Sequence, residues 1–166
     1  MTAGRLHLAV VGGSEANGAT CDLAEEVGGA VARRGAVLVC GGLGGVMEAA
    51  CRGARAGGGT TLGILPGSDR RAANPFVDVA VPTGMGEARN ALVVLCADAL
   101  VAVGGEFGTL SEIALALRNG KPAVGLDTWE LRRHGRPVDA IVPATSPEQA
   151  VDLALALAAA SRDDPV

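Results

Sequence analysis

Short runs of β-branched and aliphatic residues alternate with longer runs rich in alanine and leucine along the 166-residue chain, and this alternation constrains the fold more than any other feature. Most of the short runs are continuously apolar, as expected for strands that are covered on both faces. The predicted strands are Leu6–Val11, Ala36–Cys40, Thr60–Leu65, Val77–Val81, Leu100–Val103, Ala123–Leu126 and Ala140–Val142. The predicted helices are Thr20–Arg34, Val46–Ala56, Glu87–Ala97, Leu110–Asn119 and Pro147–Ala160.

Strands that alternate with helices are joined by right-handed crossovers, which makes the strands parallel. We therefore predict an α/β fold: a single doubly wound, Rossmann-like parallel sheet flanked by helices. The predicted domain covers residues 1–160, and residues 161–166 are expected to be a frayed tail. The polar segment Asp127–Pro137 is expected to be a surface excursion. Because aromatic residues make up only 2% of the chain, the core must consist of valine, leucine, isoleucine and alanine.

Composition and charge exclude several classes of protein. The net charge of −4 and the pI near 5.1 argue against a nucleic-acid-binding face, which needs clustered cations. No metal site is expected, because the four cysteines are far apart in sequence and form no CxxC pair. They indicate a reducing compartment, and we expect a cytoplasmic protein. No apolar stretch is long enough for a membrane span, so no membrane partner is expected.

Three of the predicted strand-to-helix turns are rich in glycine. Open α/β sheets bind ligands beyond the carboxyl ends of their strands, where helix N-termini offer free N–H groups to a phosphate. Each turn alone could be only a tight connection, but three together predict a phosphate or nucleotide site. The predicted ligand-binding residues in these turns are Gly12, Gly13 and Ser14, then Gly41, Gly42, Gly44 and Gly45, and finally Gly104, Gly105, Gly108 and Thr109.

Two charged residues near these turns are candidates for chemistry. Glu112 follows Thr109 by three residues, so it is either a catalytic carboxylate or half of a capping box with Thr109. Arg89 is predicted at the start of a helix, where a cation opposes the helix dipole. It either meets an anionic ligand, forms an ion pair with Glu87, or is a free surface arginine. A P-loop is excluded because no Gly-Lys-Ser/Thr follows any of the turns, and an NAD site lacks its glycine spacing.

From Leu6 to Leu126 the sequence resembles the Lonely Guy (LOG), or lysine decarboxylase-like, nucleotide-binding proteins, and most of all the small bacterial branch that includes molybdenum cofactor carrier proteins. The resemblance is carried by motifs in the order and spacing of that family: Val39-Cys40-Gly41-Gly42-Leu43-Gly44-Gly45-Val46-Met47, Gly63-Ile64-Leu65-Pro66-Gly67, Ala88-Arg89-Asn90 and Gly105-Glu106-Phe107-Gly108-Thr109-Leu110-Ser111-Glu112.

The resemblance implies a phosphoribohydrolase that cleaves the N-glycosidic bond of a nucleoside 5′-monophosphate to free base and ribose 5-phosphate. Arg89 and Glu112 match the catalytic Arg and Glu of those enzymes, while Met47 and Asn90 fall within the binding motifs. A carboxylate suits this reaction because the transition state is oxocarbenium-like. The chain departs from the hydrolase pattern at three positions: Asn90 stands in place of Lys, Gly104 in place of Pro, and Glu106 in place of Gly.

These departures leave two further functions open. The first is a non-enzymatic carrier for molybdenum cofactor or a similar phosphorylated ligand, and the second is a nucleotide sensor. No cofactor is required for hydrolysis, although a bound nucleotide or molybdenum cofactor fits the site. Lysine decarboxylation is not expected, because the Schiff-base cofactor of that chemistry needs a suitably placed lysine and the only lysine is Lys121. The resemblance also implies a homodimer or larger homo-oligomer, with the helices near Arg89 and Glu112 at the interface.

Overall fold

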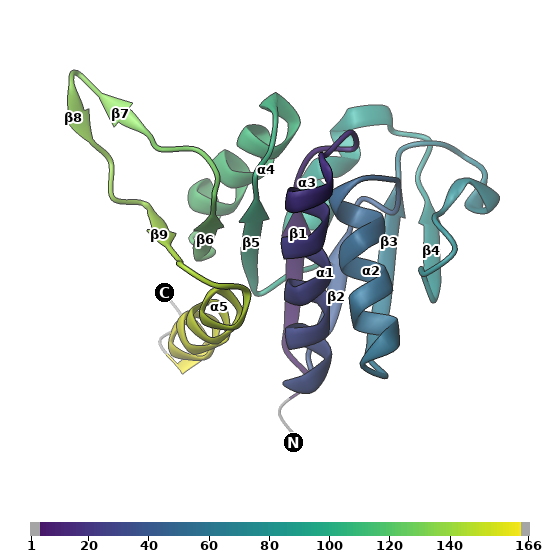
Figure 1. The fold of residues 1–166 in the computed structure, drawn as a ribbon. Helices are drawn as coiled ribbons and strands as arrows, with labels where there is room; N and C mark the ends of the chain where they lie inside the picture. Colours follow the sequence, from purple (N-terminus) through teal and green to yellow (C-terminus); the bar gives the residue numbers. More distant parts are fainter. Residues whose placement is uncertain (1–3, 164–166) are drawn as a thin grey trace.

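The computed structural model, which describes residues 4–163, contains a seven-stranded parallel sheet (Figure 1). The strand order is β4-β3-β2-β1-β5-β6-β9. Strands β1 to β4 follow one another outward on one side of the sheet, and β5 then lies beside β1 on its other side. The predicted doubly wound α/β fold is therefore confirmed. The strands are β1 (His7–Val11), β2 (Val37–Cys40), β3 (Thr60–Leu65), β4 (Val79–Pro82), β5 (Ala99–Val103), β6 (Ala123–Leu126) and β9 (Ile141–Pro143).

Helices cover both faces of this sheet. The larger apolar core lies beneath α1 (Gly18–Arg33), α2 (Val46–Ala56) and α5 (Pro147–Asp163). The smaller core lies on the other face, beneath α3 (Asn90–Leu95) and α4 (Phe107–Arg118). Every residue of β5 is buried, which explains why this strand is continuously apolar in sequence. No helix within residues 4–163 is long and apolar enough to cross a membrane.

Helices α1 and α2 pack closely because glycine faces the partner backbone on each of them. A Cβ on Gly28 of α1 would overlap the carbonyl group of Ala50 on α2. A Cβ on Gly53 of α2 would likewise overlap the carbonyl group of Glu25 on α1. The two glycines therefore set the distance between the helices, and with it the position of the turn that precedes α2.

Some element boundaries differ from the predictions. The helix expected at Glu87–Ala97 is a 3₁₀ turn, η2 (Gly86–Arg89), followed by the short α3. Helix α4 starts at Phe107 rather than Leu110, because positive φ angles at Gly104 and Gly105 turn the chain early. Helix α5 continues to Asp163, past the boundary expected at residue 160, and residues 164–166 of the expected tail lie outside the described residues.

The polar excursion between β6 and β9 contains a short hairpin that sequence analysis did not predict. Its strands are β7 (Arg132–Arg133) and β8 (Arg136–Pro137), and the turn between them has positive φ at His134 and Gly135. The hairpin projects away from the sheet, at the upper left of Figure 1. A second 3₁₀ turn, η1 (Arg70–Ala72), precedes β4.

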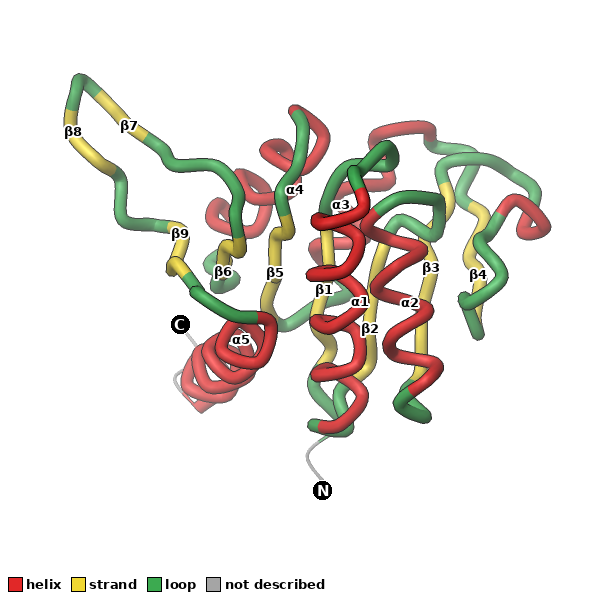
Figure 2. Tube along the Cα trace, in the orientation of Figure 1, coloured by secondary structure: helices red, strands yellow, loops and turns green. Residues whose placement is uncertain are grey.

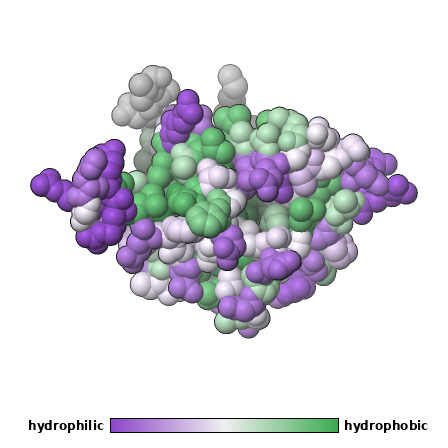
Figure 3. Space-filling view, turned by 90° about the horizontal axis from the view of Figure 1, so that it is seen from above, coloured by the Kyte–Doolittle hydropathy of each residue, from purple (hydrophilic) through white to green (hydrophobic). Residues whose placement is uncertain are grey.

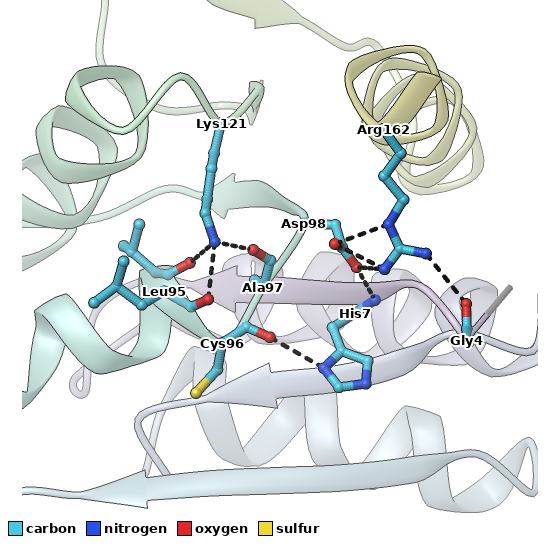
Figure 4. Close-up of polar contacts among 9 residues, drawn as sticks. Gly4, His7, Leu95, Cys96, Ala97, Asp98, Lys121 and Arg162 are labelled. Carbon is cyan, nitrogen blue, oxygen red and sulfur yellow. Dashed lines mark hydrogen bonds and ion pairs between the residues drawn. The ribbon is translucent and has the colours of Figure 1, made fainter. Parts of the chain in front are cut away.

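Polar contacts secure the amino ends of the strands, opposite the glycine-rich turns (Figure 4). Asp98 accepts the backbone N–H of His7 at 2.8 Å and pairs with the guanidinium of Arg162 on α5 at 2.8 Å. The Lys121 ammonium group donates to the backbone oxygens of Val94, Leu95 and Ala97 at the end of α3. The single lysine of the chain therefore has a structural position at this edge, where it satisfies the last carbonyl groups of α3.

Candidate functional site

The three glycine-rich turns meet at one edge of the sheet. Strand β1 is hydrogen-bonded to both β2 and β5, so the turns after these three strands are neighbours (Figure 2). We call them turn 1 (Gly12–Ser14), turn 2 (Gly41–Gly45) and turn 3 (Gly104–Glu106). The backbone N–H of Val46, at the start of α2, donates to the Gly13 oxygen of turn 1 at 3.0 Å. Parallel strands of an open sheet present this edge to a ligand.

Glycine is required where these turns touch. A Cβ on Gly12 would lie 2.6 Å from the backbone oxygen of Val103 and 2.6 Å from the Cβ of Val46. Gly45 has φ of 61°, and a Cβ there would overlap the backbone oxygens of turn 1. The floor of the site is therefore glycine backbone, with no room for a Cβ at Gly12 or Gly45.

A pocket of about 570 Å³ lies over this floor. Nine of the residues expected to bind ligand or act in catalysis line it: Gly12, Gly13, Ser14, Met47, Arg89, Asn90, Gly108, Thr109 and Glu112. Its wall also includes Glu15, Leu43, Pro66, Glu87 and Glu106, which were not among the expected ligand-binding residues. The remaining expected residues, Gly41, Gly42, Gly44, Gly45, Gly104 and Gly105, lie in turns 2 and 3 but are not part of the wall.

Turn 2 acts mainly by making room for Arg89. A Cβ on Gly41 would lie 2.6 Å from Nη2 of Arg89 and 2.8 Å from the sulfur of Met47. The Arg89 side chain comes from the end of η2 and is only 8% exposed. It donates to Oδ1 of Asn90 and, at 3.4 Å, to the Gly41 oxygen, while its Nε has no partner among residues 4–163. Arg89 is thus buried in the pocket wall, not paired with Glu87 on the surface.

Burial also dominates the electrostatics of Glu112. Its side chain is 7% exposed, and this burial raises the pKa of Glu112 to about 7, against the opposing charge of Arg89. The capping box expected as an alternative does not form, because α4 starts at Phe107 and its N-cap is Glu106 rather than Thr109. Burial lowers the pKa of Arg89, and the nearby Glu112 carboxylate counteracts this effect. The guanidinium and the carboxyl group are therefore both largely buried and both line the same pocket.

The wall of the pocket is acidic, which sequence analysis did not predict. Glu15, Glu87 and Glu106 are exposed residues of its wall, and Arg89 is the only cationic side chain there. The sequence did contain a signal for Glu106, because this residue departs from the glycine of the family loop. Glu15 and Glu87 had no comparable signal, since exposed carboxylates near turns and helix starts are common.

Figure 3 shows the molecule from the side of the carboxyl strand ends. Hydrophobic and hydrophilic residues are interspersed over the middle of this face, and the hairpin at the left is strongly hydrophilic. The hairpin supplies Arg132, Arg133 and Arg136, which are all exposed. The basic cluster of the chain therefore lies on this arm and contributes no side chain to the pocket wall.

Comparison with known proteins identifies a matching family and two proteins with similar sequences. Residues 5–151 match the model of the SLOG cluster4 family. An uncharacterized protein of Archaeoglobus fulgidus is 45% identical over 121 residues, which cover 73% of this chain and 80% of that protein. A cytokinin riboside 5′-monophosphate phosphoribohydrolase of Mycobacterium tuberculosis is 37% identical over 118 residues, which cover 65% of this chain and 63% of that protein.

The similar solved structures include two proteins that are named for binding or carrying molybdenum cofactor. The molybdenum cofactor binding protein of Rippkaea orientalis superimposes with a TM-score of 0.82 at 34% identity, over 92% of this chain and 96% of that one. The Moco carrier protein of Chlamydomonas reinhardtii gives a TM-score of 0.81 at 34% identity, over 94% of this chain and 99% of that one.

Proposed function

The chain belongs to the SLOG cluster4 family, and on this premise we propose that it is a non-enzymatic carrier for molybdenum cofactor or a similar phosphorylated ligand. The ligand would occupy the pocket above turns 1 to 3. Its phosphate would be held by backbone N–H groups at the helix N-termini and by the buried Arg89 guanidinium, whose Nε has no protein partner in the described chain.

The observation that carries this proposal is the absence of a lysine from the pocket wall. The hydrolase pattern has an Arg-Lys pair, and this chain has Asn90 in the second position. Asn90 lines the pocket and its Oδ1 accepts a hydrogen bond from Arg89, so the amide partly satisfies the guanidinium. Lys121 cannot substitute, because its ammonium group is bound to the carboxyl end of α3 at the other edge of the sheet (Figure 4). The pocket thus keeps the arginine that can bind a phosphate, but it lacks the positive charge of the lysine in the hydrolase pattern.

The resemblance of 92% and 94% of the chain to the two cofactor-binding proteins supports the same proposal. Protein purified from a host that makes molybdenum cofactor should release a fluorescent oxidised pterin when it is denatured. An Arg89→Ala variant should lose most of it, while Arg133→Ala, a change on the exposed hairpin, should retain it. Absence of any pterin, together with no binding of a phosphorylated pterin by calorimetry, would overturn the carrier function.

A phosphoribohydrolase is the second candidate, and the presence of both Arg89 and Glu112 in the wall of one pocket favours it. The relative from Mycobacterium tuberculosis is named as a phosphoribohydrolase. Incubation with AMP, CMP and an N6-modified AMP tests this alternative directly, with release of the free base as the measurement. Turnover above that of a Glu112→Ala control would establish an enzyme and reject the non-enzymatic carrier.

A further inference from the structure

Glu112 is a buried carboxyl group without a partner. The residue is 7% exposed, and its carboxyl group accepts no hydrogen bond from any residue in the described part of the chain. Arg89 lines the same pocket but does not come within ion-pair distance of it. Buried carboxyl groups normally have such partners, because burial removes the water that stabilises the charge. The pocket that Glu112 lines is therefore the remaining place from which a partner can come.

The surroundings of Glu112 favour its neutral form. Helix α3 and strands β5 and β6, which pack against α4, carry no titratable side chain. Arg89 of η2 and the Cys40 thiol at the end of β2 are the charged and titratable groups that interact with Glu112 from other elements in the described chain. The pocket wall adds three carboxyl groups, those of Glu15, Glu87 and Glu106. Burial outweighs the attraction of Arg89, and the resulting pKa of about 7 leaves about half of the Glu112 groups protonated at neutral pH.

Protonation changes what Glu112 can do in the pocket. An ionised carboxylate can only accept hydrogen bonds and repels a phosphate, whereas a protonated carboxyl group has one O–H donor. Arg89, which is 8% exposed, lines the same pocket, and its Nε has no acceptor among residues 4–163. Two buried side chains with donors to spare therefore line one cavity. A phosphate suits both of them, because it offers three strong acceptor oxygens.

We propose that Glu112 donates a hydrogen bond to the phosphate of the bound ligand, so that one proton is taken up with each ligand and the ligand is released as the pH rises. This inference rests on the proposed function, because it takes the phosphorylated ligand of that pocket as given. Where Glu112 is ionised in the free protein, the proton comes from the solvent. In the complex it stays on the carboxyl oxygen and is shared with a phosphate oxygen, while Arg89 contacts the same phosphate.

Calorimetry with AMP and with a phosphorylated pterin at pH 7 and pH 8.5 tests this inference. The phosphate of AMP is largely dianionic over this range, because its second pKa is about 6. Binding needs the neutral carboxyl group, so a pKa of about 7 predicts that the affinity of the wild type falls about 15-fold between these pH values. Glu112→Gln should show almost no fall, since its amide group is a donor at every pH. Glu87→Gln removes an exposed charge from the same pocket wall and should keep the fall.

The proton can also be counted in the wild type itself. Titrations at pH 8 in Tris and in HEPES, two buffers with different enthalpies of ionisation, give the number of protons taken up with the ligand. The wild type should take up about 0.9 proton per ligand, because about nine-tenths of the Glu112 groups are ionised one pH unit above their pKa. Glu112→Gln should take up almost none.

The outcomes separate this inference from the proposed function. Binding without proton uptake, or with the same pH dependence in the wild type and in Glu112→Gln, would overturn the role of Glu112 and leave the phosphate pocket standing. If neither probe binds to the wild type or to Glu112→Gln at pH 7, the proposed function itself fails, and the inference fails with it.

Discussion

Replacement of Glu112 by glutamine should stabilise the protein at alkaline pH. Burial raises the pKa of this carboxyl group from 4.5 to about 7 in the folded state. One pKa unit corresponds to about 1.4 kcal/mol, so ionisation of the buried group costs the folded state up to about 3 kcal/mol. Because the folded pKa is the higher one, the folded protein binds more protons than the unfolded chain between pH 4.5 and 7. Stability must therefore fall as the pH rises through this window.

Glutamine keeps the shape of the side chain and cannot ionise, so it avoids this cost. We expect the free energy of unfolding of Glu112→Gln to exceed that of the wild type by up to about 3 kcal/mol at pH 8. The difference should shrink to near zero as the pH approaches 4.5. For a chain of this size, the gain at pH 8 corresponds to a rise of about 6–12 °C in the melting temperature.

Urea unfolding at pH 4.5, 6 and 8, with the slope m compared between variants, measures the effect. Glu87→Gln is the control, because the Glu87 side chain is exposed at the same pocket and its charge remains in water. A stability difference that does not change with pH would refute the reasoning. A wild type that is more stable than Glu112→Gln at pH 8 would refute it too.

Two further predictions concern packing and assembly. Gly28→Ala should destabilise the protein by about 1–3 kcal/mol in urea unfolding despite the higher helix propensity of alanine, because its Cβ overlaps the Ala50 carbonyl group. Gly18→Ala, in open space at the start of α1, should be neutral, and equal effects would contradict this account. We also propose that α3, whose last residue Leu95 is 55% exposed, pairs two copies of the chain. Light scattering should then show a dimer that Leu95→Glu converts to monomers, and a monomeric wild type would reject it.

Much of the fold was predictable because buried parallel strands leave a direct trace in sequence. Thr60–Leu65 and Ala123–Leu126 are strands with the predicted bounds. The meeting of the three turns was also predictable, since the carboxyl ends of parallel strands share one edge. The start of the last helix was predicted as well: α5 begins at Pro147, and Oγ of Ser146 accepts the backbone N–H of Gln149 at this end.

The rest depended on contacts between residues that are distant in sequence. Whether Arg89 is buried or paired at the surface is decided by Gly41, 48 positions earlier, which leaves space for the guanidinium. Whether Glu112 forms a capping box or lines the pocket depended on where α4 begins. Positive φ angles at Gly104 and Gly105 moved that start to Phe107. The hairpin was missed because two strands of two residues each carry no alternation to detect.

The bare backbone beneath the pocket has an evolutionary consequence. The shape of a base built from main chain cannot be changed by substitution, because at Gly12 or Gly45 any side chain would collide with a neighbouring segment. Change must come instead through the surrounding side chains, such as Glu15, Glu87 and Glu106, which line the pocket and are exposed. Substitutions of these exposed side chains can thus change the charge of the pocket and leave the turns beneath it undisturbed.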